Sequence, residues 1–170
     1  TPPADAGGPG GGLAPLPASL ERPCLVEGWG QPAYATFSDD GALYAIGSQT
    51  GVVRVLRTAD DQPTLAIAAQ DSPIVTLAVS PNGALIASAA FDGTVRVPRS
   101  NGELVFSDKP VTAPVKKVAF SPDGTRLAVL GTDSYVWGRV LSTTDGATVS
   151  TLRWSTVSYW ASTVVFEPDG

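Results

Sequence analysis

Histidine and methionine are both absent from this chain of 170 residues. Histidine is the side chain that most often serves as a general base and as a metal ligand, so its absence removes most catalytic and metal-binding arrangements. No Gly-x-Ser-x-Gly nucleophile motif occurs either. The single cysteine, Cys24, excludes an internal disulfide, and we interpret it as a small apolar strand residue. We therefore predict no enzymatic activity, no metal site and no cofactor.

Positive charge is also scarce. Lys and Arg number 11 against 16 Asp and Glu, which gives a net charge of −5. Nucleic-acid binding depends on clustered basic side chains, so we predict no nucleic-acid partner. No apolar run approaches the roughly 18 residues of a membrane helix, so we predict no membrane insertion. The acidic pairs at 39–40 and 60–61 fall in predicted turns, and adjacent carboxylates on a turn rarely converge on one ion.

The first 23 residues differ in composition from the rest of the chain. They contain six prolines and five glycines and show no apolar periodicity. This composition is typical of a flexible, partly extended linker. The glycine run lacks the Gly-Lys-Ser/Thr ending of a phosphate-binding loop. We therefore predict a linker at 1–23 and a folded region at 24–170, with a short strand at Cys24–Val26.

One turn motif recurs along the folded region. Its clearest copy is Phe120-Ser121-Pro122-Asp123-Gly124, and the closing glycines of all copies stand at 41, 83, 124 and 170. The successive intervals are therefore 42, 41 and 46 residues. Pro, Asp or Asn, and Gly each favour a tight turn for a different backbone reason. Recurrence of such a turn at a nearly constant spacing indicates a structural repeat.

Each repeat contains four short segments that alternate or are rich in β-branched residues, and turn residues separate them. This pattern predicts strands, and no segment has helical spacing. The first segment of each repeat alternates least, which is typical of a strand covered on both faces. The predicted strands are 33–37, 43–48, 52–57 and 64–68; 74–79, 85–90, 94–97 and 103–106; 115–120, 126–130, 135–141 and 147–152; and 162–166.

Four-stranded antiparallel units with a period of about 40–45 residues are the signature of propeller blades. The runs 118–124 and 87–97 closely resemble blades of the WD-repeat β-propeller family, and the resemblance spans 24–170. It implies an all-β fold, namely a portion of a β-propeller with about three and a half four-stranded antiparallel blades. The blades are expected at 33–69, 73–107 and 114–153, with the start of a fourth at 161–170.

The chain departs from the family pattern at two dipeptides. The family's Trp-Asp pair is replaced in all three repeats, by Leu56-Arg57, Pro98-Arg99 and Leu141-Ser142. The family's Gly-His pair is replaced by Ala69-Gln70 in one repeat and is not recognisable in the others. Pro98 also removes a hydrogen-bond donor, so its strand is expected to lie at an edge or to end early.

In the family, that His, a strand Ser, a turn Asp and the Trp form a buried chain of hydrogen bonds. Ser88, Asp92 and Asp133 keep their places here, but without the His and the Trp we expect that the chain does not form. The blades are then expected to depend more on apolar packing between neighbours.

Three and a half blades cannot close a ring, because each blade needs a neighbour on both faces. Three sources of the missing blades stay open, namely further sequence of a longer propeller, self-association, or another chain. By fold-level analogy, the resemblance implies a non-catalytic scaffold for protein–protein interaction, with partners of unknown identity. The alternatives are a regulatory or sensor module of a larger signalling enzyme, and a structural subunit that completes a propeller in a larger assembly.

The resemblance also implies that partners bind loops on one propeller face and the central channel. The loop residues predicted there are Asp71, Phe91, Asp92, Lys109 and Asp133.

Two further groups of residues are candidates for partner binding. Trp154, Tyr159 and Trp160 lie in the longest interval between repeats, and exposed aromatic residues often anchor protein interfaces. Their alternative role is packing over the adjacent blade. A second group comprises basic residues at matching positions of successive repeats, which predict a basic arc, with a solvated strand face as the alternative. Its members are Arg54, Arg96 and Arg139.

Overall fold

The computed structural model describes residues 31–68, 70–109, 114–132, 136–153 and 163–168. Within these ranges the chain forms twelve strands and no helix, so the predicted all-β fold is confirmed. The strands are β1 Pro32–Phe37, β2 Leu43–Ser48, β3 Val52–Arg57, β4 Pro63–Ala68, β5 Ile74–Val79, β6 Ile86–Ala90, β7 Val95–Pro98, β8 Leu104–Asp108, β9 Val115–Phe120, β10 Arg126–Thr132, β11 Val136–Ser142 and β12 Thr148–Arg153.

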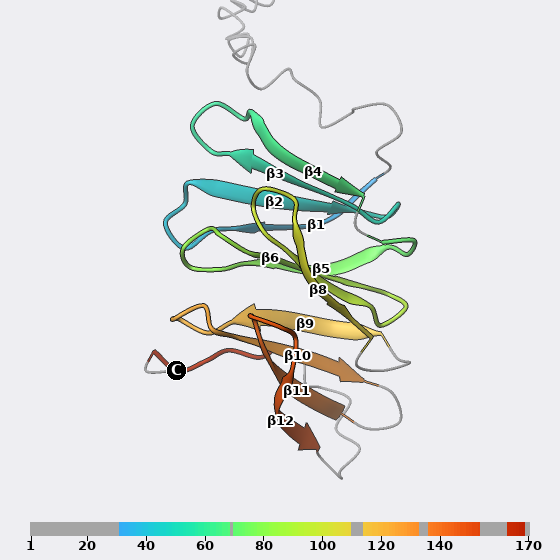
Figure 1. The fold of residues 1–170 in the computed structure, drawn as a ribbon. Coiled ribbons are helices and arrows are strands. Elements are labelled where there is room, and N and C mark those ends of the chain that lie inside the picture. Colours follow the sequence, from blue (N-terminus) through green and yellow to red (C-terminus); the bar gives the residue numbers. More distant parts are fainter. Residues whose placement is uncertain (1–30, 69, 110–113, 133–135, 154–162, 169–170) are drawn as a thin grey trace, which may run out of the picture.

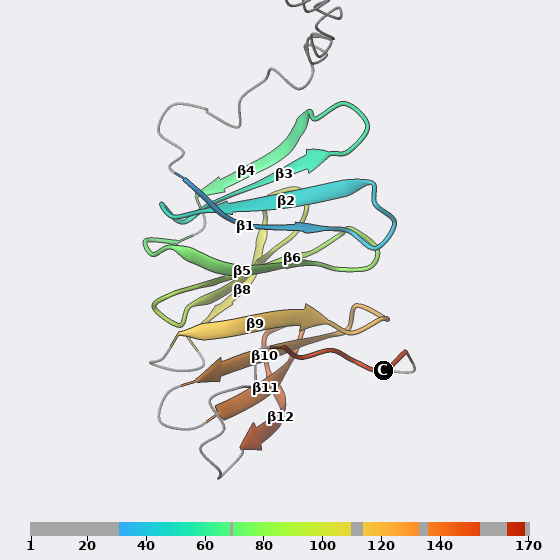
Figure 2. The ribbon, with the colours of Figure 1, turned by 180° about the vertical axis from the view of Figure 1, so that it is seen from behind.

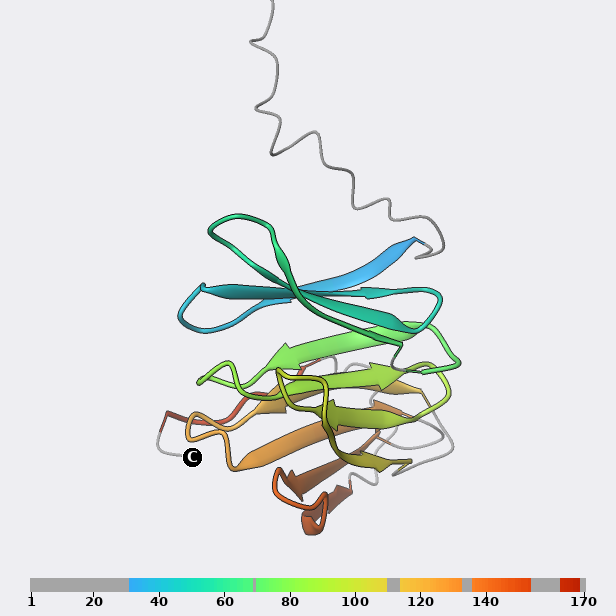
Figure 3. The same ribbon diagram turned by 45° about the horizontal axis from the view of Figure 1, so that its top comes forward.

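The strands form three antiparallel four-stranded sheets in which each strand pairs with the next in sequence. We call them sheet 1 (β1 to β4), sheet 2 (β5 to β8) and sheet 3 (β9 to β12). The sheets stack in chain order (Figure 1), and a tilted view shows the same stack (Figure 3). β5 contacts β1 and β2, and β9 contacts β5 and β6, so the first strands of the sheets lie side by side (Figure 2). We call these first strands the inner edge.

Each sheet repeats the same two irregularities of register. In the pairing of the first two strands, one residue of the first strand is left over, and these bulged residues are Ala33, Val75 and Lys116. In the pairing of the last two strands, one residue of the fourth strand is left over, namely Thr64, Val105 and Val149. A bulge bends a strand and re-aims its side chains. The recurrence of both bulges shows that the three sheets are copies of one structural unit.

A buried serine anchors the turn between the first two strands of each sheet. Ser121 Oγ donates to Asp123 Oδ1 at 2.5 Å and accepts from the backbone N–H of Arg126 at 2.9 Å. Asp123 Oδ1 also accepts from the backbone N–H of Thr125 at 3.0 Å. Gly124 follows with a φ of 71°, which a residue with a side chain rarely adopts. The same bonds recur at Ser38 with Asp40 and at Ser80 with Asn82.

Apolar side chains fill the spaces between the sheets. The space between sheets 1 and 2 is filled by Ala45, Val53, Val55, Ile74, Leu77, Val79 and Ile86. The space between sheets 2 and 3 is filled by Ala87, Ala89, Val95, Val97, Phe106, Val115, Val118, Leu127, Val129, Trp137 and Leu141. Sheets 1 and 2 approach closely at Gly47, where an added Cβ would lie 2.5 Å from Ile74 Cγ2.

Two predictions about strand ends have opposite outcomes. β7 ends at Pro98 and is the shortest described strand, with four residues, as expected from the missing donor. The strand predicted at 162–166 is wrong over 163–166, because residues 163–168 are irregular and pair with none of the described strands. An extended segment becomes a strand only when a neighbour accepts and donates its backbone hydrogen bonds.

The predicted linker at 1–23 and the predicted strand at Cys24–Val26 lie outside the described residues. In the part of the chain that the structure describes, no helix has the length and apolar character to cross a membrane.

Candidate functional site

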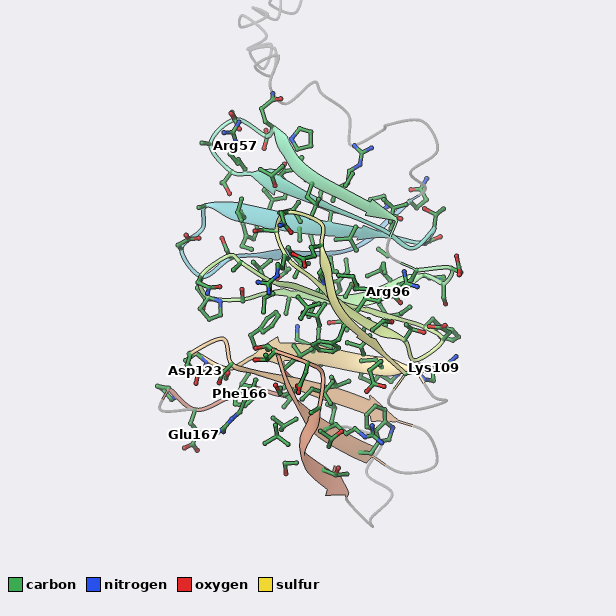
Figure 4. All side chains as sticks on the ribbon, in the orientation of Figure 1. Arg57, Arg96, Lys109, Asp123, Phe166 and Glu167 are labelled. Carbon is green, nitrogen blue, oxygen red and sulfur yellow. The ribbon has the colours of Figure 1, made fainter. Side chains whose placement is uncertain are left out.

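The loops that lead from one sheet to the next lie at one end of the stack, together with the turns between the second and third strands. We call this end the loop face; its described segments are 49–51, 70–73, 91–94 and residue 109. It lies on the right in Figure 1, opposite the serine turns. Figure 4 shows Lys109 at this end and Asp123 at the other. The loop residues predicted to share one face are therefore brought together as far as the described residues extend.

Backbone hydrogen bonds hold the loop face together across sheets 1 and 2. The N–H of Gln70 donates to the carbonyl of Gly51 in sheet 1 at 3.1 Å, and the N–H of Phe91 in sheet 2 donates to the carbonyl of Pro73 at 2.9 Å. Gly51 has a φ of 81°, and a Cβ there would overlap the carbonyl oxygen of Gln70, so only glycine fits. The segment 70–73 is thus fixed at both ends.

Phe91 and Asp92 form the most prominent described feature of the loop face. The Phe91 side chain is 60% exposed. The Asp92 carboxylate accepts from the backbone N–H and the hydroxyl of Thr94 at 3.0 and 2.9 Å, and Lys109 Nζ lies 3.7 Å away. Partial burial raises the pKa of Asp92, but the bonds from Thr94 and the charge of Lys109 outweigh it and lower the pKa below 3.8. Asp71 is exposed on the neighbouring loop.

The three matching arginines lie on the third strands of their sheets. Arg54, Arg96 and Arg139 are all half-buried. Arg139 shares a strand face with Leu141, which is buried against sheet 2, and its Nη1 lies 3.9 Å from Asp108 Oδ2 of sheet 2. The structure thus places Arg139 at the boundary between sheets 2 and 3. The basic arc stays a prediction.

Gln70 is a site residue that the sequence reasoning missed. Its Nε2 donates to both the carbonyl and the Oγ of Ser88 at 3.1 Å, and both residues are buried. We expected that the family's buried chain of hydrogen bonds does not form. This is wrong for the first bond of the chain in sheet 2, the bond to Ser88, because the amide N–H of Gln70 replaces the imidazole N–H as donor. The chain does not extend to Asp92, whose carboxylate bonds Thr94 instead.

Lys117 and Tyr34 were also missed. Lys117 Nζ on β9 donates to Tyr34 Oη on β1 at 2.6 Å, which links the two outer sheets of the stack across the inner edge. The signal in the sequence was the adjacent pair Lys116-Lys117, which occupies the places held by Val75-Thr76 in the preceding repeat. A pair of charges in an otherwise apolar first strand departs from the repeat.

The remaining candidates, Asp133, Trp154, Tyr159 and Trp160, lie outside the described residues. Among the residues that are described, no group of three or more His, Cys, Asp or Glu side chains could hold a metal ion.

Comparisons with known proteins agree with the repeat architecture. Residues 77–166 match the family described as the WD40 domain of anaphase-promoting complex subunit 4. A WD repeat-containing protein of Schistosoma mansoni, SL1-17, is 32% identical over 114 residues. That match covers 66% of this chain and 37% of the relative, so the chain spans well under half of the relative's length.

Proposed function

The chain belongs to the WD-repeat family, and on this premise we propose that it is a non-catalytic interaction scaffold that binds protein partners through its loop face. Proteins of this family generally act as interaction scaffolds. The observation that best supports the loop face is Phe91, a large apolar side chain that is 60% exposed on a hydrogen-bonded turn. Exposed aromatic side chains are frequent anchors of protein interfaces.

The rigidity of the loop face supports the same proposal. Segment 70–73 is bonded to sheet 1 through Gly51 and to sheet 2 through Phe91, so little conformational entropy is lost when a partner docks. Asp71, Asp92 and Lys109 lie on the same face as Phe91, and Lys109 Nζ is 3.7 Å from the Asp92 carboxylate. Charges at the rim of an interface contribute more to orientation and association rate than to affinity.

The test compares two phenylalanines of nearly equal exposure. Phe91 is 60% exposed on the loop face. Phe37 is 62% exposed at the end of β1, next to the serine turn and away from the loop face. Immobilised wild-type chain, Phe91→Ala and Phe37→Ala are compared for the proteins that each retains, with circular dichroism as the folding control. We expect Phe91→Ala to lose proteins that wild type and Phe37→Ala retain. Retention of the same proteins by all three would contradict binding through the loop face.

We also propose a structural function, in which sheet 1 is covered by a further sheet of a completed propeller. The observation that favours it is the pair Phe37 and Tyr44, whose ring centroids are 5.8 Å apart on the face of sheet 1 that points away from sheet 2. If a second copy supplies the cover, native mass spectrometry gives a dimer mass for wild type and a monomer mass for Phe37→Asp. A monomer mass for both variants would contradict covering by a second copy.

A further inference from the structure

All three lysines of the chain fall within nine residues, at 109, 116 and 117. Lys109 lies beside Asp92, but no ion pair reaches Lys116 or Lys117 within the part of the chain that the structure describes. Lys116 is exposed at the bulge of β9, and Lys117 is half-buried next to it. A half-buried ammonium without a counter-charge is unusual in a chain whose net charge is −5.

The neighbour of Lys117 is neutral. Its Nζ lies 2.6 Å from Tyr34 Oη but 5.3 Å from the centroid of the ring. The ammonium therefore lies beyond the hydroxyl at the edge of the ring, so the contact is a hydrogen bond and the face of the ring is not used. Tyr34 accepts this bond and keeps its own O–H to donate, and the ammonium keeps two further N–H groups.

The repeat places a second hydroxyl, that of Thr76, at the same level of the inner edge. Tyr34, Thr76 and Lys117 each follow the bulged residue of their strand, on three neighbouring strands. Thr76 is fully buried, and its Oγ1 has no hydrogen-bond partner among the described residues. This level of the inner edge therefore offers positive charge and spare hydrogen-bond donors, and no described carboxylate balances them.

We propose that Lys116, Lys117 and Tyr34 form a site for a carboxylate side chain of a protein partner. The proposal rests on the proposed function, because β9 begins at the loop face and the site would receive an acidic segment of the partner docked there. A carboxylate accepts charge-assisted hydrogen bonds from the ammonium and the O–H of Tyr34 and supplies the missing counter-charge. A nucleic acid is disfavoured because 16 acidic residues outnumber 11 basic ones.

The probe is a fluorescein-labelled hexaglutamate peptide titrated into the full chain, with a hexaglutamine peptide as the neutral control. Lys117→Gln is expected to weaken hexaglutamate binding by about tenfold, and Lys117→Arg to retain it, because arginine keeps the charge and the donors. Arg57→Gln is the matched control, since it removes a positive charge from an exposed side chain of sheet 1 that is already paired with Asp60 at 2.8 Å. It is expected to change binding by less than about twofold.

A second measurement uses the wild-type chain, so it does not depend on how a variant folds. The lysines are labelled with ¹³C during expression, and the Cε signals of the three side chains are followed as hexaglutamate is added. We expect the signals of Lys116 and Lys117 to shift more than that of Lys109.

Three results would overturn the inference: no hexaglutamate binding at millimolar concentration, equal weakening by Lys117→Gln and Arg57→Gln, or equal shifts of the Cε signals of all three lysines. If one of these results is found and Phe91→Ala still fails to retain partner proteins, the carboxylate site is contradicted and the proposed function of the loop face stands. Lys117-dependent binding of hexaglutamate combined with unchanged retention by Phe91→Ala contradicts the loop-face function and leaves the carboxylate site.

Discussion

Sheets 1 and 2 present the same strand face to different surroundings. We call this face the leading face. In sheet 2 it is the face that packs on sheet 1. At matching positions it carries Phe37 and Tyr44 in sheet 1 and Val79 and Ile86 in sheet 2. Phe37 is 62% exposed, whereas Val79 is 7% exposed and Ile86 is fully buried. The pairing, the bulges and the serine turns are nevertheless the same in both sheets.

This difference separates two contributions to the fold. Strand pairing and turn geometry are complete within one sheet, because their hydrogen bonds are all local to it. Apolar burial is completed only by the neighbouring sheet. A large side chain left in water forgoes about 1.5–3 kcal/mol compared with full burial. The boundaries between sheets therefore add apolar burial that a single sheet cannot supply, as in other repeat proteins.

The largest expected effect comes from truncation on the buried leading face. Ile86→Ala leaves a cavity between sheets 1 and 2, and we expect it to lower the free energy of unfolding by about 2–5 kcal/mol. Phe37→Ala removes a larger side chain from the leading face of sheet 1, and in the monomeric chain, where no further sheet is supplied, we expect a change within about 0.5 kcal/mol. Urea unfolding followed by circular dichroism measures both. Similar losses for the two variants would mean that the leading face of sheet 1 is covered.

The close approach of sheets 1 and 2 provides the next effect. An alanine at Gly47 would bring its Cβ to 2.5 Å from Ile74 Cγ2, so Gly47→Ala must push the sheets apart. We expect it to cost about 1–3 kcal/mol of unfolding free energy. In the double variant with Ile74→Ala, the contact with Cγ2 is absent, so the loss should be smaller than the sum of the two single losses. Simple additivity in urea unfolding would argue against the clash.

A comparable effect is expected within sheet 2 at the bond between Gln70 and Ser88. Gln70→Ala leaves the buried oxygens of Ser88 without this donor, and we expect a loss of about 1–3 kcal/mol. Gln70→His restores the residue of the family pattern and keeps a ring N–H, so it should lose less than Gln70→Ala. The melting temperatures of the three proteins test this order. If both variants melt as wild type does, the bond contributes nothing to stability.

The fold was largely predictable because its signals are local. All twelve described strands were predicted, since the serine turns and the alternating segments each act within a few residues. The first strand of a fourth blade was predicted wrongly for the same reason. The pattern at 163–166 is that of a strand, but a strand also needs a partner, and the pattern of one segment carries no information about its partner.

The candidate site was less predictable because its contacts join distant parts of the sequence. The turn that carries Phe91 and Asp92 was predictable because a turn is a local motif, and their role in binding stays a prediction. The bond between Lys117 and Tyr34 spans 83 residues and depends on how three sheets stack, so no short pattern encodes it. Gln70 was overlooked because the family pattern has histidine there, although an amide can donate the same bond.

The smallest effect compares the serine turns of sheets 2 and 3 through pH. The hydroxyl of Ser121, then the backbone N–H and the hydroxyl of Thr125, lower the pKa of Asp123 from 3.8 to about 2, while Asn82 makes the same turn in sheet 2 without a charge. Because the folded pKa is depressed, the stabilisation by Asp123 is fully present above about pH 4 and is lost as the pH falls toward about 2.

Replacing Asp123 by asparagine should therefore lower the urea midpoint at pH 6, and the gap to wild type should close between about pH 4 and about pH 2. Carboxyl groups common to both proteins cancel in this difference, so the closing of the gap reports Asp123 alone. Asn82→Asp is the reciprocal variant and should add a second acid-sensitive contribution, since the bonds from Ser80 and from the backbone N–H of Ala84 are already in place. A gap that stays constant with pH would show that the carboxylate acts only through its shape, as the amide of Asn82 does.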